Sequence, residues 1–426
     1  MRVCAFFSIL LLSILLMAFF TVAVHATPTW EIQRLDADTG YVSAIALDSN
    51  NNPHILYSDY ENGNPHNPQD VMYASWTGLS WKIQTVVEGD ARENTHLYNF
   101  VLDSNNNPYI LYDGVNGLMC ASWTGSNWTL QTIDKEGSYG GFIALDSAGN
   151  LHVAYKVNLA PSNYPQGITK NIAMLKYANL NGTNWDTQTV DSPMSYLDGV
   201  YLAFDSNNRP HILYGYDNGS ASTSVKYTMW NGSSWNTKII LPNVLLYGNM
   251  ALDSKGYPDF IYEKNYLNTL VYASWNGSAC NTQTIASNAN PGMPIGFLTL
   301  DTYNYPHIDF FNESSQSLIY ARWTGRLWDI QTVGPNSLAI EAGPIAVDSN
   351  GNAHITYSGF HQSSPNLVNY CMYATVAEPI YTPTPFPTQV SSSTFLTFSS
   401  LIIISVLIII IAATLVYIWK KKIKKP

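Results

Sequence analysis

Apolar and polar residues alternate along most of this 426-residue chain, in short runs that are separated by turn-forming residues. The run Tyr41 to Leu47 ends at Asp48, a turn follows, and the run His54 to Tyr57 resumes the alternation. A period of two, with β-branched and aromatic residues in the runs and Gly, Asn and Pro between them, is typical of antiparallel strands. Residues 30–376 show no helical periodicity, so the pattern predicts an all-β domain.

The same stretch recurs seven times along the chain. Each copy opens its first turn with an Asp, and the average spacing of about 50 residues is typical of propeller blades rather than of helical solenoids. These residues are Asp48, Asp103, Asp146, Asp205, Asp253, Asp301 and Asp348. Because each copy predicts four short strands, the chain predicts a seven-bladed β-propeller of four-stranded antiparallel blades.

The two ends of the repeat region complete one blade between them. Most copies end in a fourth strand with the signature Trp-x-x-Gln, but the last copy stops after its third strand, Asn369 to Val376. The stretch Trp30 to Leu35 has the form of a fourth strand with nothing before it. Pairing the two would remove open strand edges, which expose unpaired backbone groups. We therefore expect a ring closed by the N-terminal strand.

Both termini lie outside this domain, 27–376. Residues 1–26 hold an apolar run followed by small residues, the pattern of a cleaved secretory signal. Residues 377–397 are rich in Pro, Thr and Ser, which favours an extended stalk over a packed core. Residues 398–419 are long and apolar enough for one transmembrane helix. The basic tail 420–426 predicts a cytoplasmic C-terminus, with the propeller outside the cell membrane.

Net charge narrows the classes of partner, and the positions of the cysteines indicate whether disulfides form. Without Arg2 and the five tail lysines, 14 basic and 30 acidic side chains remain, a formal charge of −16. This acidity argues against binding to nucleic acid or to an anionic lipid surface. Cys120, Cys280 and Cys371 lie in different copies without regular spacing, so they predict buried apolar residues rather than disulfides.

Six Asn-x-Ser/Thr sequons fit an exported chain, but they also arise from the repeated Asn-Gly-Ser turn. They begin at Asn127, Asn181, Asn218, Asn231, Asn276 and Asn312.

The repeated aromatic and ionisable residues are expected to belong to the scaffold. Eleven of the twelve Trp lie in the repeats, where flat rings can fill the gaps between neighbouring blades. Five histidines begin second strands, and blades keep such positions too far apart for one zinc ion, so we expect them to form structural hydrogen bonds. These are His54, His152, His211, His307 and His354. Each Asp turn carries one carboxylate, too few for calcium, so no metal and no cofactor are expected.

One hairpin resembles a known sequence motif. Residues 122–128, Ser-Trp-Thr-Gly-Ser-Asn-Trp, resemble the Asp-box, Ser-x-Asp-x-Gly-x-Thr-Trp, of sialidases and other neuraminidase-repeat propellers, although the Asp is missing. The resemblance implies a sialidase-superfamily-like propeller of prokaryotic cell-surface proteins. Catalytic residues do not carry over, because sialidases hold the substrate with three arginines and only Arg92 among the five exported arginines is well placed.

Antiparallel topology predicts where a binding site lies. The repetitive turns share one face, and the second-to-third and blade-to-blade loops, which vary between copies, share the other. Tyrosines and carboxylates are enriched in these variable loops, which suits recognition of sugars or of a basic protein patch. The candidate ligand-binding residues are Tyr60, Glu61, His66, Glu88, Asp90, Arg92, Glu93, His96, Tyr98, Tyr139, Tyr164, Tyr196, Asp198, Tyr216, Tyr247, Glu263, Tyr266, Glu341 and His361.

The sequence leaves three functions open. No phosphate-binding loop, zinc-protease motif or nucleophile elbow is present, so catalysis has no positive support. We expect a membrane-anchored extracellular propeller that binds a surface glycan or protein without catalysis. The alternatives are a sialidase-like glycoside hydrolase or lyase, for which Glu88 and Asp90 could supply paired carboxyls, and a structural envelope component.

Overall fold

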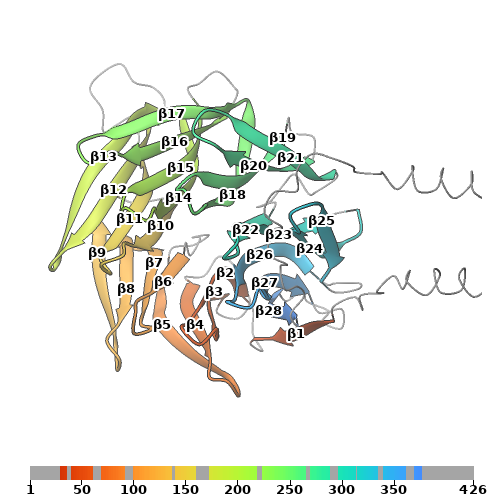
Figure 1. The fold of residues 1–426 in the computed structure, drawn as a ribbon. Helices are drawn as coiled ribbons and strands as arrows, with labels where there is room; N and C mark the ends of the chain where they lie inside the picture. Colours follow the sequence, from red (N-terminus) through yellow and green to blue (C-terminus); the bar gives the residue numbers. More distant parts are fainter. Residues whose placement is uncertain are drawn as a thin grey trace, which may run out of the picture. The chain divides into compact units, whose positions relative to one another are not determined.

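The computed structural model describes residues 29–35, 40–60, 69–91, 99–136, 140–159, 172–217, 223–264, 269–287, 296–312, 314–333, 339–360 and 369–376. These residues form 28 β-strands, arranged as seven four-stranded antiparallel blades (Figure 1). The predicted signal, stalk, transmembrane segment and basic tail lie outside the described residues. Among the residues that are described, no helix is long and apolar enough to cross a membrane.

Blades 1 to 4 follow one another along the chain. Blade 1 is β2 (Gly40–Leu47), β3 (Pro53–Tyr60), β4 (Gln69–Trp76) and β5 (Trp81–Ala91). Blade 2 is β6 (Asn99–Leu102), β7 (Pro108–Gly114), β8 (Gly117–Trp123) and β9 (Trp128–Asp134). Blade 3 is β10 (Gly141–Leu145), β11 (Leu151–Leu159), β12 (Ile172–Asn181) and β13 (Asn184–Met194). Blade 4 is β14 (Tyr196–Phe204), β15 (Pro210–Asp217), β16 (Ser224–Trp230) and β17 (Trp235–Pro242).

Blades 5 to 7 complete the set, and the last one takes its outer strand from the N-terminus. Blade 5 is β18 (Val244–Leu252), β19 (Pro258–Lys264), β20 (Thr269–Trp275) and β21 (Cys280–Ser287). Blade 6 is β22 (Gly296–Leu300), β23 (Pro306–Asn312), β24 (Ser317–Trp323) and β25 (Trp328–Thr332). Blade 7 is β26 (Ala339–Val347), β27 (Ala353–Phe360), β28 (Asn369–Val376) and β1 (Trp30–Arg34).

The ring closes as the sequence predicts. Strand β1 pairs antiparallel with β28, with Trp30 opposite Val376 and Arg34 opposite Met372 (Figure 1). The first strands of neighbouring blades contact one another in the order β2, β6, β10, β14, β18, β22, β26 and back to β2. This closed cycle places the first strand of each blade innermost and the fourth outermost. The seven-bladed propeller predicted from the repeats is therefore confirmed.

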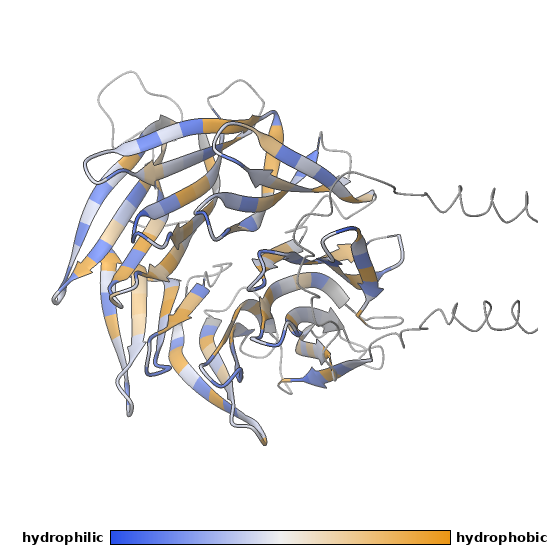
Figure 2. Cartoon of the chain, viewed as in Figure 1, coloured by the Kyte–Doolittle hydropathy of each residue, from blue (hydrophilic) through white to orange (hydrophobic). Residues whose placement is uncertain are grey.

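The core consists of the layers between blades. Alternate side chains of each strand face the next blade and the previous blade, so the first six residues of a second strand such as β15 are all buried. Figure 2 shows hydrophilic and hydrophobic bands along the strands. Leu56 and Tyr73 of blade 1 pack against Ile110 and Tyr112 of blade 2, and all four are buried. Burial of an aromatic ring removes roughly 150–250 Å² from water, so these layers account for much of the stability of the ring.

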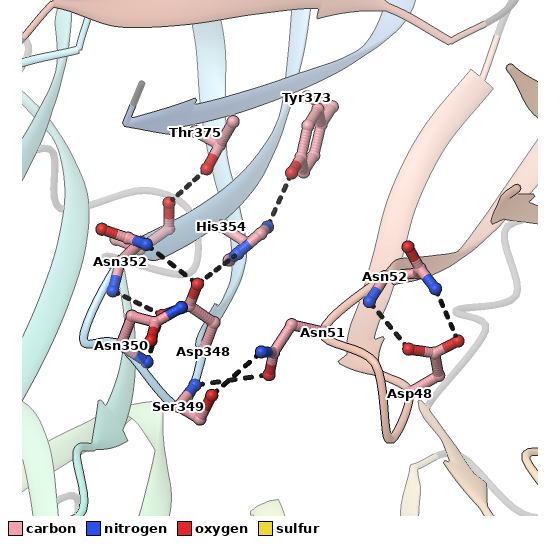
Figure 3. Close-up of polar contacts among 11 residues, drawn as sticks. Asp48, Asn51, Asn52, Asp348, Ser349, Asn350, Asn352, His354, Tyr373 and Thr375 are labelled. Carbon is pink, nitrogen blue, oxygen red and sulfur yellow. Dashed lines mark hydrogen bonds and ion pairs between the residues drawn. The ribbon is translucent and has the colours of Figure 1, made fainter. Parts of the chain in front are cut away.

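The first turn of each blade is shaped by its Asp, as expected. In blade 7, Asp348 accepts hydrogen bonds from the backbone of Asn350 and Asn352 at 2.8 Å (Figure 3). The fourth turn residue has a positive φ, and Asn or Gly occupies this position because both tolerate left-handed backbone. The prediction from the sequence that these Asp side chains cap tight turns is therefore confirmed.

Neighbouring turns are linked by an Asn–Ser clamp. Asn51 of blade 1 donates from Nδ2 to Ser349 Oγ of blade 7 at 2.9 Å, and its Oδ1 accepts from Ser349 N at 3.3 Å (Figure 3). Asn106 bonds to Ser49 in the same way across blades 1 and 2. The clamp between Asn51 and Ser349 ties the last blade to the first, in addition to the β1–β28 pairing within blade 7.

Candidate functional site

The strand ends place the two faces of the propeller as the sequence predicts. First strands end and second strands begin at the Asp turns, and the tight third-to-fourth hairpins lie at the same end of each blade. The second-to-third and blade-to-blade connections lie at the other end, which we call the loop face. A scaffold residue recurs at one position in most blades, so a site is best sought where a blade departs from that pattern.

Most of the predicted ligand-binding residues lie outside the described residues. These are Glu61, His66, Arg92, Glu93, His96, Tyr98, Tyr139, Tyr164, Tyr266 and His361. The structure describes the backbone of five others but not their side chains, namely Tyr60, Asp90, Tyr196, Asp198 and Tyr247. The side chains of Glu88, Tyr216, Glu263 and Glu341 are described.

The expectation that all of these residues lie in loops was wrong for the described ones. Tyr60, Glu88, Asp90, Tyr196, Asp198, Tyr216, Tyr247, Glu263 and Glu341 all lie in strands. Strand β5 continues to Ala91, and β14 begins at Tyr196, with only Ser195 between it and the end of β13. Strands extend this far because backbone pairing continues where the apolar alternation that marks a strand in the sequence has stopped.

The three predicted glutamates with described side chains differ in environment. Glu88 is exposed at the end of β5. Glu263 is 1% exposed and so is not available at the surface. Burial raises the pKa of Glu341, which lies opposite Ser358 at the inner strand of blade 7. Of these three side chains, only Glu88 is freely accessible to a ligand at the loop face.

Histidines of the repeat form a structural triad, as expected. In blade 3, His152 Nδ1 lies 2.7 Å from Tyr177 Oη, and its Nε2 lies 3.6 Å from Asp146 Oδ2. Burial lowers the pKa of His152, and the nearby carboxylate only partly opposes this effect. The same contacts recur at His54, His211, His307 and His354. These side chains couple the first turn to the third strand and are not free to act on a ligand.

Tryptophans of the fourth strand also belong to the scaffold. Trp81 packs edge to face against Trp76 in its own hairpin and against Tyr373 in the preceding blade, with ring centroids 5.3 Å apart in both pairs. Equivalent contacts join Trp128 to Tyr73 and Trp328 to Tyr272. This recurrence confirms the prediction that the rings fill the gaps between blades.

Four buried acids depart from the repeat in the second strands. Asp113, Asp259, Glu263 and Asp309 are each at most 3% exposed, at positions where most other blades have no acid. Burial raises the pKa of Asp309 well above its usual range, and burial also raises the pKa of Asp259, to about 6. They are too deeply buried to contact a ligand at the surface.

A more accessible group of residues that departs from the repeat pattern lies between blades 2 and 3. Asp134, the last residue of β9, accepts hydrogen bonds of 2.8 Å from Tyr155 Oη and from Lys176 Nζ in blade 3. Lys176 also donates to Glu136 at 2.8 Å. Tyr155 and Lys176 lie directly opposite each other on β11 and β12, so both side chains face blade 2.

The same group recurs between blades 3 and 4. Asp191 on β13 accepts hydrogen bonds from Tyr214 Oη at 2.6 Å and from Lys226 Nζ at 2.7 Å. Tyr214 and Lys226 lie opposite each other on β15 and β16. Lys226 Nζ also lies 4.0 Å from the centroid of the half-buried Tyr216 ring, a cation–π contact. We call the two groups the Asp–Tyr–Lys clusters.

Three other blade boundaries, at which the structure describes both positions, hold apolar residues there. The residue six positions after the repeated Trp, or after Cys280 in blade 5, is Asp134 or Asp191 in the clusters but Val87, Leu241 and Ala286 at the three other boundaries where the structure describes it. The residue before the third-strand Tyr, which is Cys120 in blade 2, is Lys176 or Lys226 in the clusters but Met72, Met119, Val271, Ile319 and Met372 elsewhere. The propeller therefore packs without these charges, and the clusters are not required by the repeat.

The clusters are partly buried ion pairs. Burial alone would raise the pKa of Asp134, but its bonds from Lys176, from the Glu136 backbone and from Tyr155 hold that pKa below its usual value. Burial lowers the pKa of Lys176, and the two carboxylates more than reverse this effect. Burial raises the pKa of both tyrosines, so their hydroxyls remain protonated donors.

This arrangement suits recognition more than proton transfer. Each cluster presents a lysine with three donors, a carboxylate with several acceptor sites and a phenol, and Tyr216 adds an aromatic face. A phenol with a raised pKa is a poor general base at neutral pH. Among the described residues, no group of three or more His, Cys, Asp and Glu side chains is arranged to hold a metal ion.

Comparison with solved structures supports the fold. A catalytically inactive virginiamycin B lyase from Staphylococcus aureus, solved with quinupristin, is 10% identical, with a TM-score of 0.52 over 82% of this chain and 99% of that chain. A fucoside complex of the Aleuria aurantia lectin is 15% identical, with a TM-score of 0.46 over 70% and 97% of the two chains. A polysaccharide lyase is 9% identical, with a TM-score of 0.49 over 83% and 93%. No protein-family model and no curated protein matches the chain.

Proposed function

We propose that this protein is a non-catalytic binding propeller, displayed outside the cell membrane on a single C-terminal helix, which recognises a surface glycan. The Asp–Tyr–Lys clusters at two consecutive boundaries carry the proposal. Partly buried charges are costly to desolvate. The other boundaries at which both positions are described have apolar residues in place of the Asp and the Lys. A function beyond packing explains why blades 3 and 4 retain them.

Chemistry of the clusters favours a neutral glycan. Each lysine is already paired with a carboxylate, and the exported part is strongly acidic, so an anionic sugar would meet no uncompensated positive charge. Sugar hydroxyls can both donate and accept hydrogen bonds, and Tyr216 offers a ring face for stacking. The predicted Tyr196 and Asp198 lie on the same blade as Tyr216, in β14.

Aliphatic substitutions taken from other blades test the proposal. The double variant Asp191→Leu with Lys226→Val installs the residues found at Leu241 and Val271, and Asp134→Val with Lys176→Met installs those found at Val87 and Met119. We expect the full-length protein in detergent to bind neutral glycans on an array, and both double variants to lose at least tenfold in affinity with the fold intact.

The control variant changes the opposite face. Arg209→Asn, in the Asp turn of blade 4, installs the residue found at Asn52 and Asn107 and should leave binding unchanged. Unchanged binding by both cluster variants would refute the site. Turnover of glycosides would instead favour the sialidase-like hydrolase or lyase, and absence of any bound glycan would favour a protein ligand or a structural envelope component.

The location is tested separately from ligand binding. Protease treatment of intact cells should release fragments of the propeller, and the protein should sediment with membranes. Recovery of an intact soluble chain would refute the membrane anchor, whatever the chain binds.

A further inference from the structure

The third-to-fourth hairpins contain two kinds of turn. Blades 1, 2 and 6 have Thr-Gly turns, and blades 3, 4 and 5 have Asn-Gly turns followed by Thr or Ser. The Thr turns begin at Thr77, Thr124 and Thr324, and the Asn turns begin at Asn181, Asn231 and Asn276. Each Asn turn is therefore an N-glycosylation sequon, and the three lie in consecutive blades.

Thr and Asn serve the same structural purpose in these hairpins. Thr77 Oγ1 accepts a hydrogen bond from Ser80 N at 3.1 Å. Asn231 Oδ1 accepts from Ser234 N at 2.9 Å, and Asn276 Oδ1 accepts from Ala279 N at 3.0 Å. Because a Thr satisfies the same backbone group, the turn itself does not require Asn.

In two of the sequons, the hydroxyl contacts the acceptor side chain. Ser233 Oγ donates to Asn231 Oδ1 at 3.0 Å, and Ser278 Oγ donates to Asn276 Oδ1 at 2.8 Å. All four residues are exposed at a hairpin tip. Asn181 is also exposed, and its Nδ2 donates to the Asp186 carboxylate on β13 at 3.1 Å. The Nδ2 of Asn231 donates within its own turn instead, to Ser234 Oγ at 3.2 Å.

The outer strands of blades 3 to 5, which carry the Asn turns, also differ from those of the other four blades in an exposed side chain near the hairpin. The residue two positions after the repeated Trp, or after Cys280 in blade 5, is Thr187, Thr237 or Thr282 in blades 3 to 5. In the other four consecutive blades it is an exposed aliphatic residue, Ile330, Ile32, Ile83 or Leu130. Hydroxyls therefore lie beside the Asn turns and aliphatic groups lie on the other blades. Ile239 in blade 4 is an exception, two residues further from the turn.

The sequon at Asn127 provides an internal contrast. Its Thr129 lies in β9 and shares a 2.8 Å hydrogen bond with Ser122 across the hairpin. Its middle residue, Trp128, packs against Tyr73 of the preceding blade. The hydroxyl and the middle residue are therefore both held in the blade, unlike those of the Asn-Gly-Ser turns.

We propose that Asn231 and Asn276 are N-glycosylated, which gives blades 4 and 5 a glycan-covered rim. The proposal rests on the proposed location outside the cell. In the reaction, Nδ2 forms a bond to C1 of a sugar that is carried on a lipid-linked phosphate. The bond between C1 and the phosphate oxygen breaks, the lipid phosphate leaves with that electron pair, and one amide proton passes to a base of the membrane transferase.

Mass spectrometry of glycopeptides tests the proposal on the full chain purified from its native membranes. We expect sugar mass on the peptides that contain Asn231 and Asn276, and none on Asn127. Bare peptides at both sites, from a propeller that protease treatment of intact cells shows to be outside, would overturn glycosylation but leave the location intact. Equal modification of Asn127 would overturn the dependence on turn geometry.

Two kinds of variant separate modification from folding. Asn231→Thr and Asn276→Thr install the turn of blades 1 and 2, and Ser233→Ala and Ser278→Ala retain the Asn but destroy the sequon. All four should fold, and each should lose the sugar mass at its own site only. Retention of that mass in a Ser→Ala variant would show that the modification is not sequon-directed and would overturn the proposal.

Discussion

Trp328 Nε1 donates a 3.0 Å hydrogen bond to Gln283 Oε1, across the boundary between blades 5 and 6. Trp81 donates to Gln33 in the same way, at 3.1 Å, across the closure of the ring. In β21, Cys280 stands where the other fourth strands have this Trp, and at this boundary the partner position holds Lys238 in place of Gln. This boundary therefore lacks both members of the pair. The bond itself forms at the two boundaries above, whereas the buried Nε1 of Trp30, Trp128, Trp185 and Trp235 has no hydrogen-bond partner.

Restoring this pair should stabilise the protein more than either change alone. Lys238→Gln with Cys280→Trp recreates the contact, whereas either single variant supplies one partner only. We expect a favourable coupling of about 1 kcal/mol in a double-mutant cycle of thermal or denaturant unfolding. Strictly additive effects of the two changes would show that the hydrogen bond is not what links them.

Asp259 makes the protein less stable as the pH rises. It occupies the histidine position of blade 5, accepts a 2.8 Å bond from Tyr272 Oη, and burial raises its pKa to about 6. Well below pH 4 the carboxyl is protonated in both the folded and the unfolded chain. Between pH 4 and 6 only the unfolded chain loses the proton, so the free energy of unfolding falls by up to about 3 kcal/mol.

Asp259→Asn should remove this pH dependence. The variant is expected to match the wild type near pH 4 and to exceed its unfolding free energy at pH 7, as measured by denaturant titration at several pH values. Asp146→Asn is the matched control, because the hydrogen bonds of the Asp146 turn hold its pKa below normal despite burial. That control should lose stability at pH 7, and an Asp259→Asn profile parallel to the wild type would contradict the prediction.

The Asn51 clamp should contribute modestly to ring closure. Asn51→Gly keeps a residue that tolerates the positive φ of 64° but removes both bonds to Ser349. We expect a loss of about 1 kcal/mol in unfolding free energy. Asn51→Ala should lose about 1 kcal/mol more, because a Cβ is unfavourable in left-handed backbone. Equal losses in the two variants would show that backbone strain plays no part.

Removal of only the carboxylate of an Asp–Tyr–Lys cluster should destabilise the protein more than removal of both the carboxylate and the lysine. Asp191→Leu alone leaves Lys226 partly buried without its carboxylate, for which we expect a loss of several kcal/mol. Adding Lys226→Val should recover most of that loss, because Leu241 and Val271 fill the same positions in the next blade. Unfolding by urea would measure both effects, and a double variant as unstable as the single one would refute the view that the cluster is dispensable for packing.

Strand number, blade number and closure could be predicted from the sequence because each depends on local patterns. Period-two runs mark strands, and the Trp-x-x-Gln signature at Trp30 identifies a fourth strand without a blade of its own. Strand ends could not be predicted, because β5 and β14 extend by backbone pairing into segments without apolar alternation. Such pairing depends on the neighbouring strand and not on the local residues.

The candidate site could be predicted only in part. Tyr216 was expected at the loop face, but its neighbour Lys226 and the partner Asp191 were not. These residues come from different copies of the repeat and meet only because each blade packs on the next. Aligning the copies offers the signal that was missed: an Asp six residues after Trp, followed in the next copy by a Lys immediately before the repeated Tyr.

The distribution of the Asn–Ser clamps reflects the odd number of blades in the ring. The left-handed turn position is Asn in blades 1, 2, 4 and 6 and Gly in blades 3, 5 and 7. Strict alternation can close without a mismatch only when the number of units is even, and this ring has seven. The mismatch leaves Asn in two adjacent blades, so blade 1 is clamped by Asn51 to blade 7 and by Asn106 to blade 2. The odd number of blades thus places two successive clamps where the chain closes on itself.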